Sequence, residues 1–255
     1  MILASWNVNS ISARLDHVKQ WLEQHEVDVL CMQETKTIDE KFPRQAFEEL
    51  GYELAIYGEK TYNGVAIASK LPITNVQRGY EVEIGGGSKR LIAAEIDGVQ
   101  IVNVYIPNGQ YVGSDKYSYK LSWMKKLKEF VFEKYEKSQP VLICGDFNIA
   151  PDDRDVYNPG LVFESIMCST EERQHLDEIR EFGFEDIFRR HHDEGGCFSW
   201  WDYRAGAFRR NWGFRIDHIW TTQSLAERSV NCLIDKEIRK LEKPSDHAPV
   251  IAEFS

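Results

Sequence analysis

The stretch PVLICGDFNIAP, residues 140–151, decides how this chain folds and where its polar side chains gather. Residues 141–144 form an unbroken apolar run, which is typical of a strand buried on both faces. Gly145 then permits a tight turn or a close backbone approach, and Asp146 and Asn148 point the same way if the extended conformation continues. A carboxylate and an amide thus follow a buried strand, at the edge where open α/β sheets bind ligands. An Asx turn is the alternative explanation, because Asp and Asn are common turn residues.

The composition predicts one compact domain spanning residues 1–255. The chain is 42% hydrophobic and contains no linker, repeat or low-complexity tract. No signal peptide or membrane-length apolar segment is recognisable, so we expect a cytoplasmic protein with no membrane association. The five scattered cysteines lack CxxC spacing and read as reduced core residues. A net charge of −10 argues against bulk electrostatic coating of nucleic acid, although a local basic face remains compatible with it.

Apolar runs alternate with amphipathic segments along the whole chain, which predicts an α/β sandwich containing mixed sheets. Asp97-Gly98 is a two-residue hairpin signal between two of the strands. We expect strands at 2–7, 27–32, 51–56, 64–69, 91–96, 99–106, 141–144, 215–221 and at the carboxyl terminus. We expect helices after Ser10 or Ser12, at 42–50, at 120–135 and at 171–183.

Polar residues suited to catalysis lie at or beside the ends of several apolar runs. They are Asn7, Glu34, Asn108, Asp146 with Asn148, Asp217, and the pair Asp246-His247. Each has a structural alternative: a turn residue, a helix cap, an ion-pair partner of an arginine, or a histidine with a purely structural role. Six such positions together favour a cleft that the strand ends share.

This set of side chains suits the hydrolysis of a phosphate ester. Glu34, with one or two further oxygen ligands, matches Mg²⁺, which keeps most of its waters and binds substrate phosphate. Asp146 would accept a proton from the attacking water while Asn148 fixes the direction of that water. His247 would donate to the scissile phosphate, with its charge and tautomer set by a carboxylate such as Asp217. Clustered His and Cys residues for zinc and a GxSxG serine motif are both absent from the sequence.

Eight segments resemble, in the same order, the exonuclease III family of DNA repair nucleases within the DNase I-like phosphoesterase superfamily. They are SWNVNS, LCMQETK, NGVAI, NVYIPN, VLICGDFNIAP, FSWWDYR, RIDHI and PSDHAPV. GDFN and SDH alone indicate the superfamily, which includes inositol and lipid phosphatases, whereas QETK, FSWWDYR and PSDHAPV are more specific. The resemblance implies a four-layer α/β sandwich with two packed, mainly antiparallel sheets. It also implies Mg²⁺-dependent action, with Mn²⁺ as an alternative ion, on duplex DNA with 3′ termini or abasic sites.

The resemblance assigns roles position by position. Glu34 would bind the metal with Asn7 beside it, and Asp246 is a candidate second metal ligand; whether one or two ions act stays open. Tyr105 would touch the scissile phosphate. The implied catalytic residues are Tyr105, Asp146, Asn148, Asp217 and His247.

Residues 198–215, FSWWDYRAGAFRRNWGFR, combine four arginines and seven aromatic residues with a single acid, Asp202. Guanidinium groups hold phosphates, and aromatic side chains engage bases or a base-less sugar. A surface loop with some aromatics tucked into the core is the alternative. The resemblance places Trp200, Phe214 and Ile216 around the nucleotide pocket. The full set of expected DNA contacts is Arg90, Asn108, Lys116, Met167, Trp200, Arg204, Trp212, Phe214, Arg215 and Ile216.

Two positions depart from the family pattern. Residues 163–170, FESIMCST, carry Met167 where relatives resembling abasic-site endonucleases have an Asn-containing loop that ends in small residues and an aromatic. Asn9 stands where some relatives place an acid. A bulky loop would obstruct continuous duplex, so we expect 3′-exonuclease or 3′-phosphatase activity to be favoured over incision at internal abasic sites.

Other functions remain open at this point. A predominantly abasic-site endonuclease of the same family is the nearest one. A superfamily phosphatase acting on a small or lipid phosphate would not need the arginine-aromatic segment. A catalytically inactive DNA-binding module would be expected to have lost Glu34, Asp146, Asp217 or His247, and all four are present. A monomer is the plain expectation.

Overall fold

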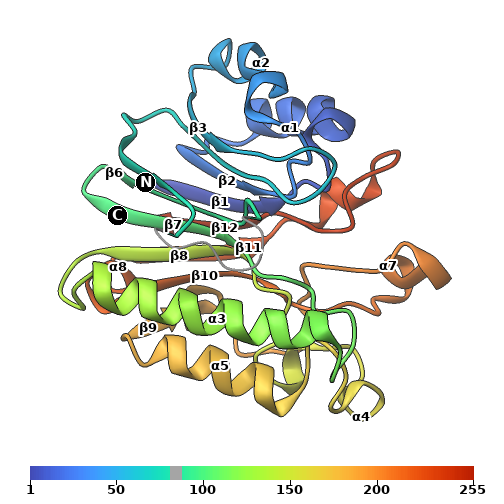
Figure 1. Ribbon diagram of the computed structural model, residues 1–255. Helices are drawn as coiled ribbons and strands as arrows, with labels where there is room; N and C mark the ends of the chain where they lie inside the picture. Colours follow the sequence, from blue (N-terminus) through green and yellow to red (C-terminus); the bar gives the residue numbers. More distant parts are fainter. Residues whose placement is uncertain (81–87) are drawn as a thin grey trace.

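Two six-stranded sheets pack face to face, and helices cover their outer faces, as predicted (Figure 1). The computed structural model describes residues 1–80 and 88–255. The first sheet has the strand order β11-β12-β1-β2-β4-β3, and the second has the order β5-β6-β7-β8-β10-β9. Among the described residues, no helix is both long and apolar enough to cross a membrane.

Each sheet combines one parallel strand pair with antiparallel neighbours. The parallel pairs are β1 with β2 and β7 with β8, so four strands end at the same edge of the sandwich. The first sheet contains β11 (Ser229–Ile234), β12 (Val250–Phe254), β1 (Ile2–Asn7), β2 (Val29–Gln33), β4 (Val65–Ser69) and β3 (Glu53–Tyr57). The second contains β5 (Thr74–Arg78), β6 (Leu91–Ile96), β7 (Val99–Tyr105), β8 (Val141–Asp146), β10 (Asp217–Thr222) and β9 (Phe184–Asp186).

The helices form the two outer layers. The first sheet is covered by α1 (Ile11–Gln24) and α2 (Arg44–Glu48), and the second by α3 (Asp115–Lys134) and α5 (Thr170–Arg180) (Figure 1). Shorter helices are α4 (Pro159–Val162), α6 (Ile187–His191), α7 (Ala207–Arg210) and α8 (Gln223–Ala226). Single 3₁₀ turns are η1 (Asp39–Lys41), η2 (Asp153–Asp155), η3 (Arg204–Gly206) and η4 (Lys236–Lys240). Ser10 caps α1, since its hydroxyl accepts a hydrogen bond from the backbone N–H of Ala13.

A pair of buried amides lies between the sheets, near the edge where the four strands end. Gln33 of β2 donates to the side-chain oxygen of Asn103 on β7 at 2.7 Å. Asn103 donates in turn to the backbone carbonyls of Met32 and Ala66 at 3.0 and 2.9 Å. Buried amides are tolerated when they are hydrogen-bonded, so these bonds fix the two sheets in register beside the site.

Candidate active site

Six strands deliver polar side chains to one edge of the sandwich. The parallel strands β1, β2, β7 and β8 end there, and the antiparallel strands β10 and β12 begin there. The register places Asp146 opposite both Tyr105 and Asp217. Gly145 makes this approach feasible, because a Cβ at its position would lie 1.9 Å from the carbonyl oxygen of Val104.

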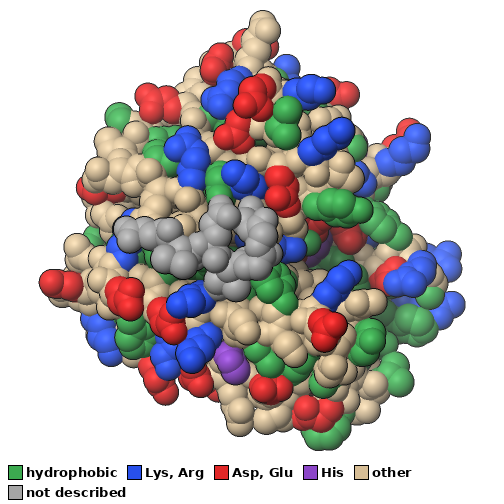
Figure 2. Space-filling model, viewed as in Figure 1, with side chains coloured by type: hydrophobic (Ala, Val, Ile, Leu, Met, Phe, Trp, Pro, Cys, Tyr) green, Lys and Arg blue, Asp and Glu red, His purple; other side chains and the backbone are tan. Residues whose placement is uncertain are grey.

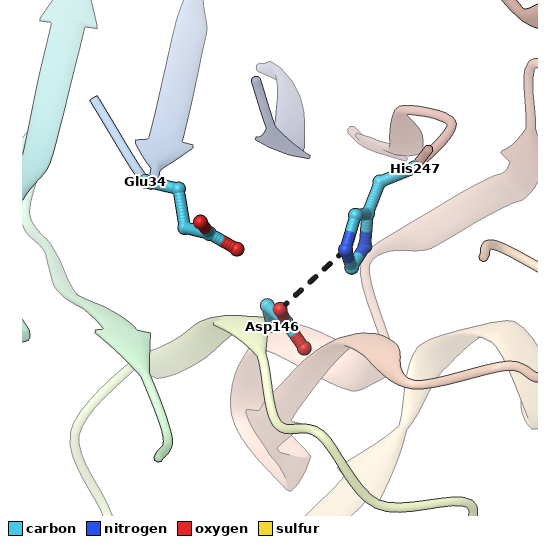
Figure 3. A group of neighbouring side chains, drawn as sticks. All are labelled: Glu34, Asp146 and His247. Atoms are coloured by element: carbon cyan, nitrogen blue, oxygen red, sulfur yellow. Dashed lines mark ion pairs between the residues drawn. The ribbon is translucent and has the colours of Figure 1, made fainter. Parts of the chain in front are cut away.

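Glu34, Asp146 and His247 converge at the centre of this edge (Figure 3). One potential ligand atom from each residue lies within 4.8 Å of the other two. Nε2 of His247 is 3.7 Å from Oδ2 of Asp146. Glu34 follows β2 with a left-handed φ of 50°, an unusual conformation for glutamate that turns its side chain into the cleft.

Two asparagines hold the Asp146 carboxylate. The amide of Asn7 donates to Glu34 and to Asp146, at 2.9 Å in each case. Asn148 donates its backbone N–H to Oδ1 of Asp146 at 2.9 Å and its side-chain amide to Oδ2 at 3.2 Å. The side chain of Asn108 donates to Oδ1 of Asn148 at 3.1 Å, so this amide is itself held in place.

His247 is oriented by a buried chain of hydrogen bonds. Its Nδ1 lies 2.9 Å from Oδ2 of Asp217, and Ser199 donates its hydroxyl to that same oxygen at 2.6 Å. Ser199 accepts in turn from the backbone N–H groups of Ile216 and Asp217. A carboxylate on Nδ1 sets the tautomer and orientation of an imidazole, so Nε2 is directed toward Asp146.

Burial and crowding perturb the ionisation of this group. Burial, reinforced by the neighbouring carboxylates of Asp217 and Glu34, raises the pKa of Asp146 to about 7. Burial opposes the charged form of His247, but the carboxylates of Asp217 and Asp146 outweigh it and raise its pKa to about 10. Burial likewise opposes ionisation of Glu34, yet the Lys36 ammonium at 2.8 Å holds its pKa below the usual range.

The crowded carboxylates fit a hard divalent cation. Asp146 ionises with difficulty because it is buried and because other acids lie near it, and a bound cation would favour its charged form. Glu34 and Asp146 offer the oxygen ligands that Mg²⁺ prefers. Asn7 uses its amide hydrogens to hold both acids together, while its oxygen accepts the backbone N–H of Asn9.

Asp246 lies outside the three-residue cluster, within a second hydrogen-bonded chain. Its two oxygens accept from the Asn9 amide at 2.8 Å and from the Trp200 indole at 3.0 Å. Lys36 connects this chain to Glu34, because its ammonium also donates to Oδ1 of Asn9 at 2.6 Å. Asn9 thus serves as donor to Asp246 and acceptor from Lys36.

Apart from Arg215, the expected DNA contacts fall into three groups. Arg90, Asn108 and Lys116 line, together with Tyr105, a cavity of about 430 Å³. The Arg90 guanidinium lies over the Tyr105 ring, 4.5 Å from its centroid. A small apolar cluster contains Met167, Trp200, Phe214 and Ile216. Arg204 and Trp212 are exposed beyond this cluster.

Arg215 is an expected DNA contact that the structure contradicts. Its side chain is buried, and Nε lies 2.6 Å from Oδ1 of Asp155 while Nη2 lies 2.8 Å from Oδ2 of Asp186. Two carboxylates therefore hold the guanidinium inside the protein, where it cannot reach a DNA phosphate. Its neighbour Ile216 is also buried, at the base of the apolar cluster.

Arg215→Met is expected to lower the free energy of unfolding by about 3–5 kcal/mol, because it leaves the buried Asp186 carboxylate without its guanidinium and the buried Asp155 with Arg189 alone. Urea denaturation of the metal-free protein measures the loss. Arg204→Met is the matched control from the same segment: the Arg204 side chain is 88% exposed and pairs with Asp202. The control should change stability by no more than about 0.5 kcal/mol. Equal effects of the two substitutions would contradict the buried ion-pair assignment.

Asp155 should make this ion-pair network sensitive to acid. Burial alone would raise its pKa, but the guanidinium groups of Arg215 and Arg189 hold the pKa of Asp155 at about 2. A lowered carboxyl pKa stabilises the fold above the unfolded pKa and loses that contribution as pH falls toward the folded value. The stability difference between wild type and Asp155→Asn should therefore shrink by about 1 kcal/mol between pH 7 and pH 3. Urea titrations at the two pH values measure it; a constant difference would contradict the assignment.

Several residues of the site were not identified from the sequence. Ser199 lies in the segment FSWWDYR and Lys36 in LCMQETK, but no sequence pattern marks either residue as part of the site. Lys120, as a lysine on a helix, is expected to contact the DNA backbone or to be solvated, yet it is fully buried. Its spacing carries a signal, because it falls on the same helical stripe as the buried Met124 and Leu127 of α3.

Residues 4–247 match the model of the Endonuclease/Exonuclease/phosphatase family. The chain belongs to this family. It is 36% identical to exodeoxyribonuclease III of Haemophilus influenzae, with all of both chains covered. It is 34% identical to an exodeoxyribonuclease of Bacillus subtilis, with 98% of each chain covered. This similarity over the full length makes it an exodeoxyribonuclease III-type hydrolase of the family.

Two solved structures of family members are similar over the whole chain. The 3′ phosphatase NExo from Neisseria, bound to a product DNA hairpin, is 40% identical with a TM-score of 0.96, covering 100% of this chain and 99% of that one. An AP endonuclease from Archaeoglobus fulgidus is 39% identical with the same TM-score and the same coverage. A 3′-end enzyme and an abasic-site enzyme are thus equally similar, so overall likeness does not rank the two activities.

Proposed function

We propose that the chain is a Mg²⁺-dependent DNA repair phosphodiesterase that acts on duplex DNA. The observation that carries this proposal is the convergence of Glu34, Asp146 and His247, with Asp217 bonded to the histidine. The Asp146 carboxylate can take a proton and the His247 imidazole can give one. Both lie beside Glu34, whose oxygens suit a metal ion. Names of relatives that include exodeoxyribonuclease, 3′ phosphatase and AP endonuclease support the substrate class.

The proposed mechanism divides the chemistry among this chain's own residues. Asp146 takes the proton of the attacking water, and the Asn148 amide fixes the water's direction. His247, held charged by Asp217, donates to the phosphate oxygen on which charge develops. Tyr105 faces the same phosphate, with Arg90 over its ring. Magnesium, held by Glu34 and its neighbours, would supply charge neutralisation at the phosphate.

DNA would be held by the arginine-aromatic segment around α7. Arg204, Arg209 and Arg210 are exposed there, and the Arg210 guanidinium lies 4.5 Å from the centroid of the exposed Trp212 ring. Figure 2 shows Lys and Arg side chains gathered on the protrusion where Figure 1 places α7. The chain has a net charge of −10, so a basic surface is an exception in this protein. Contacts to DNA phosphates need positive charge, which makes this surface a suitable DNA contact. A small or lipid phosphate would not need this segment.

The purified chain is expected to release inorganic phosphate from a duplex with a 3′-phosphate, and nucleotides from a recessed 3′ end, only when Mg²⁺ is present. Excess chelator should abolish both reactions, because Glu34 and Asp146 alone leave the phosphate charge uncompensated. Malachite-green phosphate release and gel-resolved end-labelled DNA measure them. The rival reading is supported if an inositol phosphate is hydrolysed faster than any DNA.

Met167 would direct the enzyme toward 3′ ends. Its backbone has a left-handed φ of 71° and its side chain packs in the apolar cluster beside Trp200 and Ile216. We expect a 3′-phosphate duplex to be processed at least about tenfold faster than a duplex with an internal abasic analogue, a difference of about 1.4 kcal/mol in barrier. Glycine fits the left-handed backbone at this position, so Met167→Gly should bring the rates on the two duplexes closer together. A wild type that cleaves the internal abasic duplex faster would contradict the preference.

The proposed compartment and ion follow from the same chemistry. All five cysteines are free, which fits a reducing cytoplasm. Oxygen ligands fit Mg²⁺ and also accept Mn²⁺, so either ion is expected to support activity.

A further inference from the structure

A buried ion pair lies beneath the active site, between the two helices that cover the second sheet. Lys120 of α3 and Glu172 of α5 are both completely buried, and Nζ lies 2.5 Å from Oε1. A buried charge is stable only when it is paired and hydrogen-bonded. The three hydrogens of the ammonium match three acceptors: this carboxylate and the backbone carbonyls of Asn108 and Asn148.

One of these carbonyls belongs to Asn148, which is proposed to orient the reacting water, and the other to Asn108, which holds Asn148. Nζ of Lys120 lies 2.8 Å from the carbonyl oxygen of Asn148, whose amide groups hold Asp146. It lies 3.2 Å from the carbonyl oxygen of Asn108, whose side chain holds Asn148. The Lys120 ammonium therefore holds the backbone of both asparagines.

Glu172 reaches the segment that contains Met167. Its Oε1 accepts the backbone N–H of Met167 at 3.1 Å. Its Oε2 accepts the backbone N–H and the hydroxyl of Ser169, at 3.1 and 2.7 Å. The backbone N–H of Ala150 donates to the Met167 carbonyl at 2.8 Å, which closes the connection back to the loop after β8.

Gly109 shows how tightly these parts pack. A Cβ at this position would lie 2.9 Å from Cδ1 of Ile166 and 3.0 Å from Cδ of Lys120, and the glycine has a φ of +90°. The turn after Asn108, the lysine side chain and the segment before Met167 are thus in direct contact. Each part leaves the others little room to move.

We propose that Lys120 and Glu172 are positioning residues that fasten the water-handling asparagines and the Met167 segment to one buried anchor. This inference rests on the proposed function and deepens it. A shift of the Met167 segment, which faces the substrate terminus, would be transmitted through Glu172 and Lys120 to Asn148. The position of the attacking water and the fit of the substrate end then depend on the same buried ion pair.

Lys120→Met removes the charge while keeping an unbranched chain. It is expected to lower kcat for phosphate release from a 3′-phosphorylated duplex by about 30-fold or more, because misplacement on the order of 1 Å costs about 10²-fold. KM for the duplex should change by less than about threefold, since no DNA-facing group is removed. Lys120→Arg keeps the cation and should recover part of kcat. Each kcat is normalised to the concentration of folded enzyme, which is measured from the amplitude of DNA binding at saturation.

Lys128→Met is the matched control. Lys128 pairs with Glu178 at 3.2 Å across the same two helices, but at the surface. Its removal should leave kcat within about twofold, because exposed pairs contribute little. If Lys120→Met does not fold, Glu172→Gln takes its place under the same criterion. A folded variant of the buried pair that matches the kcat of Lys128→Met overturns the proposal.

Hydrogen exchange tests the shared anchor without relying on activity. Backbone exchange in residues 146–149 and 164–169 should rise together in Glu172→Gln, and neither segment should change in Lys128→Met. A rise in one segment alone overturns the coupling. A wild type inactive on every DNA substrate would refute the proposed function, and the exchange result would still decide whether the anchor exists.

Discussion

Asp146→Asn is expected to lower kcat for release of phosphate from a 3′-phosphorylated duplex by about 10³–10⁴-fold, the upper range for loss of a general base. An amide cannot take the proton of the attacking water. Asparagine also offers only one acceptor oxygen, whereas Asp146 accepts at Oδ1 from Asn148 and at Oδ2 from both Asn7 and Asn148. Single-turnover kinetics at saturating Mg²⁺ measure the effect.

The same substitution should not weaken the metal-free fold. Burial, aided by neighbouring acids, raises the pKa of Asp146 to about 7. A raised carboxyl pKa means that ionisation of this group costs stability above its unfolded pKa. In chelator at pH 8, Asp146→Asn should therefore melt at or above the wild-type temperature. Unchanged kcat, or a large fall in melting temperature that accompanies the loss of kcat, would contradict the role given to Asp146.

His247→Gln is expected to have the second-largest effect, a fall in kcat of about 10²–10⁴-fold. Glutamine keeps a donor but carries no charge, so the phosphate loses the cation that Asp217 maintains at 2.9 Å. KM for DNA should change much less than kcat, because the charge matters most where the phosphate gains negative charge.

His175→Gln is the control for this substitution. His175 is half-buried on α5, outside the site, and its Nδ1 lies 3.0 Å from the Glu171 carbonyl oxygen. Its replacement should leave kcat unchanged. If His247→Gln kept more than about a tenth of the wild-type kcat, the loss would be under about 1.4 kcal/mol, too small for a group that donates to the reacting phosphate.

The central strands were predictable from the sequence, and several edge strands were not. β8 is buried along its whole length and β1 is buried except at Ile2, so runs of mainly apolar residues mark both strands. The unpredicted strands β5, β9 and β11 lie at sheet edges. β5 and β11 have mostly exposed or half-buried residues, and β9 has only three residues. An edge strand needs one neighbour and little apolar surface, which leaves a weak periodic signal.

Helix boundaries depended on caps more than on apolar spacing. The stripe of α3 predicts its body, but the helix begins at Asp115, five residues before the expected start at Lys120. Ser114 explains the difference, because its hydroxyl accepts the backbone N–H of Tyr117 at 3.1 Å.

Residue type alone did not reveal where each charged side chain points. Arg215 lies in a segment rich in arginine and aromatics, yet Asp155 and Asp186, 60 and 29 residues away in sequence, draw it into the interior. The burial of Lys120 was equally hard to predict, because its partner Glu172 is 52 residues away in sequence. The local pattern of apolar and polar residues predicts where a strand ends. The partner of a buried charge depends on tertiary packing, which that pattern does not reveal.

A divalent cation held by Glu34 and Asp146 is the central requirement of this mechanism. Anomalous diffraction from crystals soaked in Mn²⁺ tests it most directly, because Mn²⁺ accepts the same oxygen ligands as Mg²⁺ and scatters anomalously. The mechanism predicts a peak about 2.2 Å from a Glu34 carboxylate oxygen, in the cleft shared with Asp146 and His247, and its loss in Glu34→Gln. A peak absent from this cleft in crystals of active wild-type enzyme, or retained there in Glu34→Gln, would contradict it.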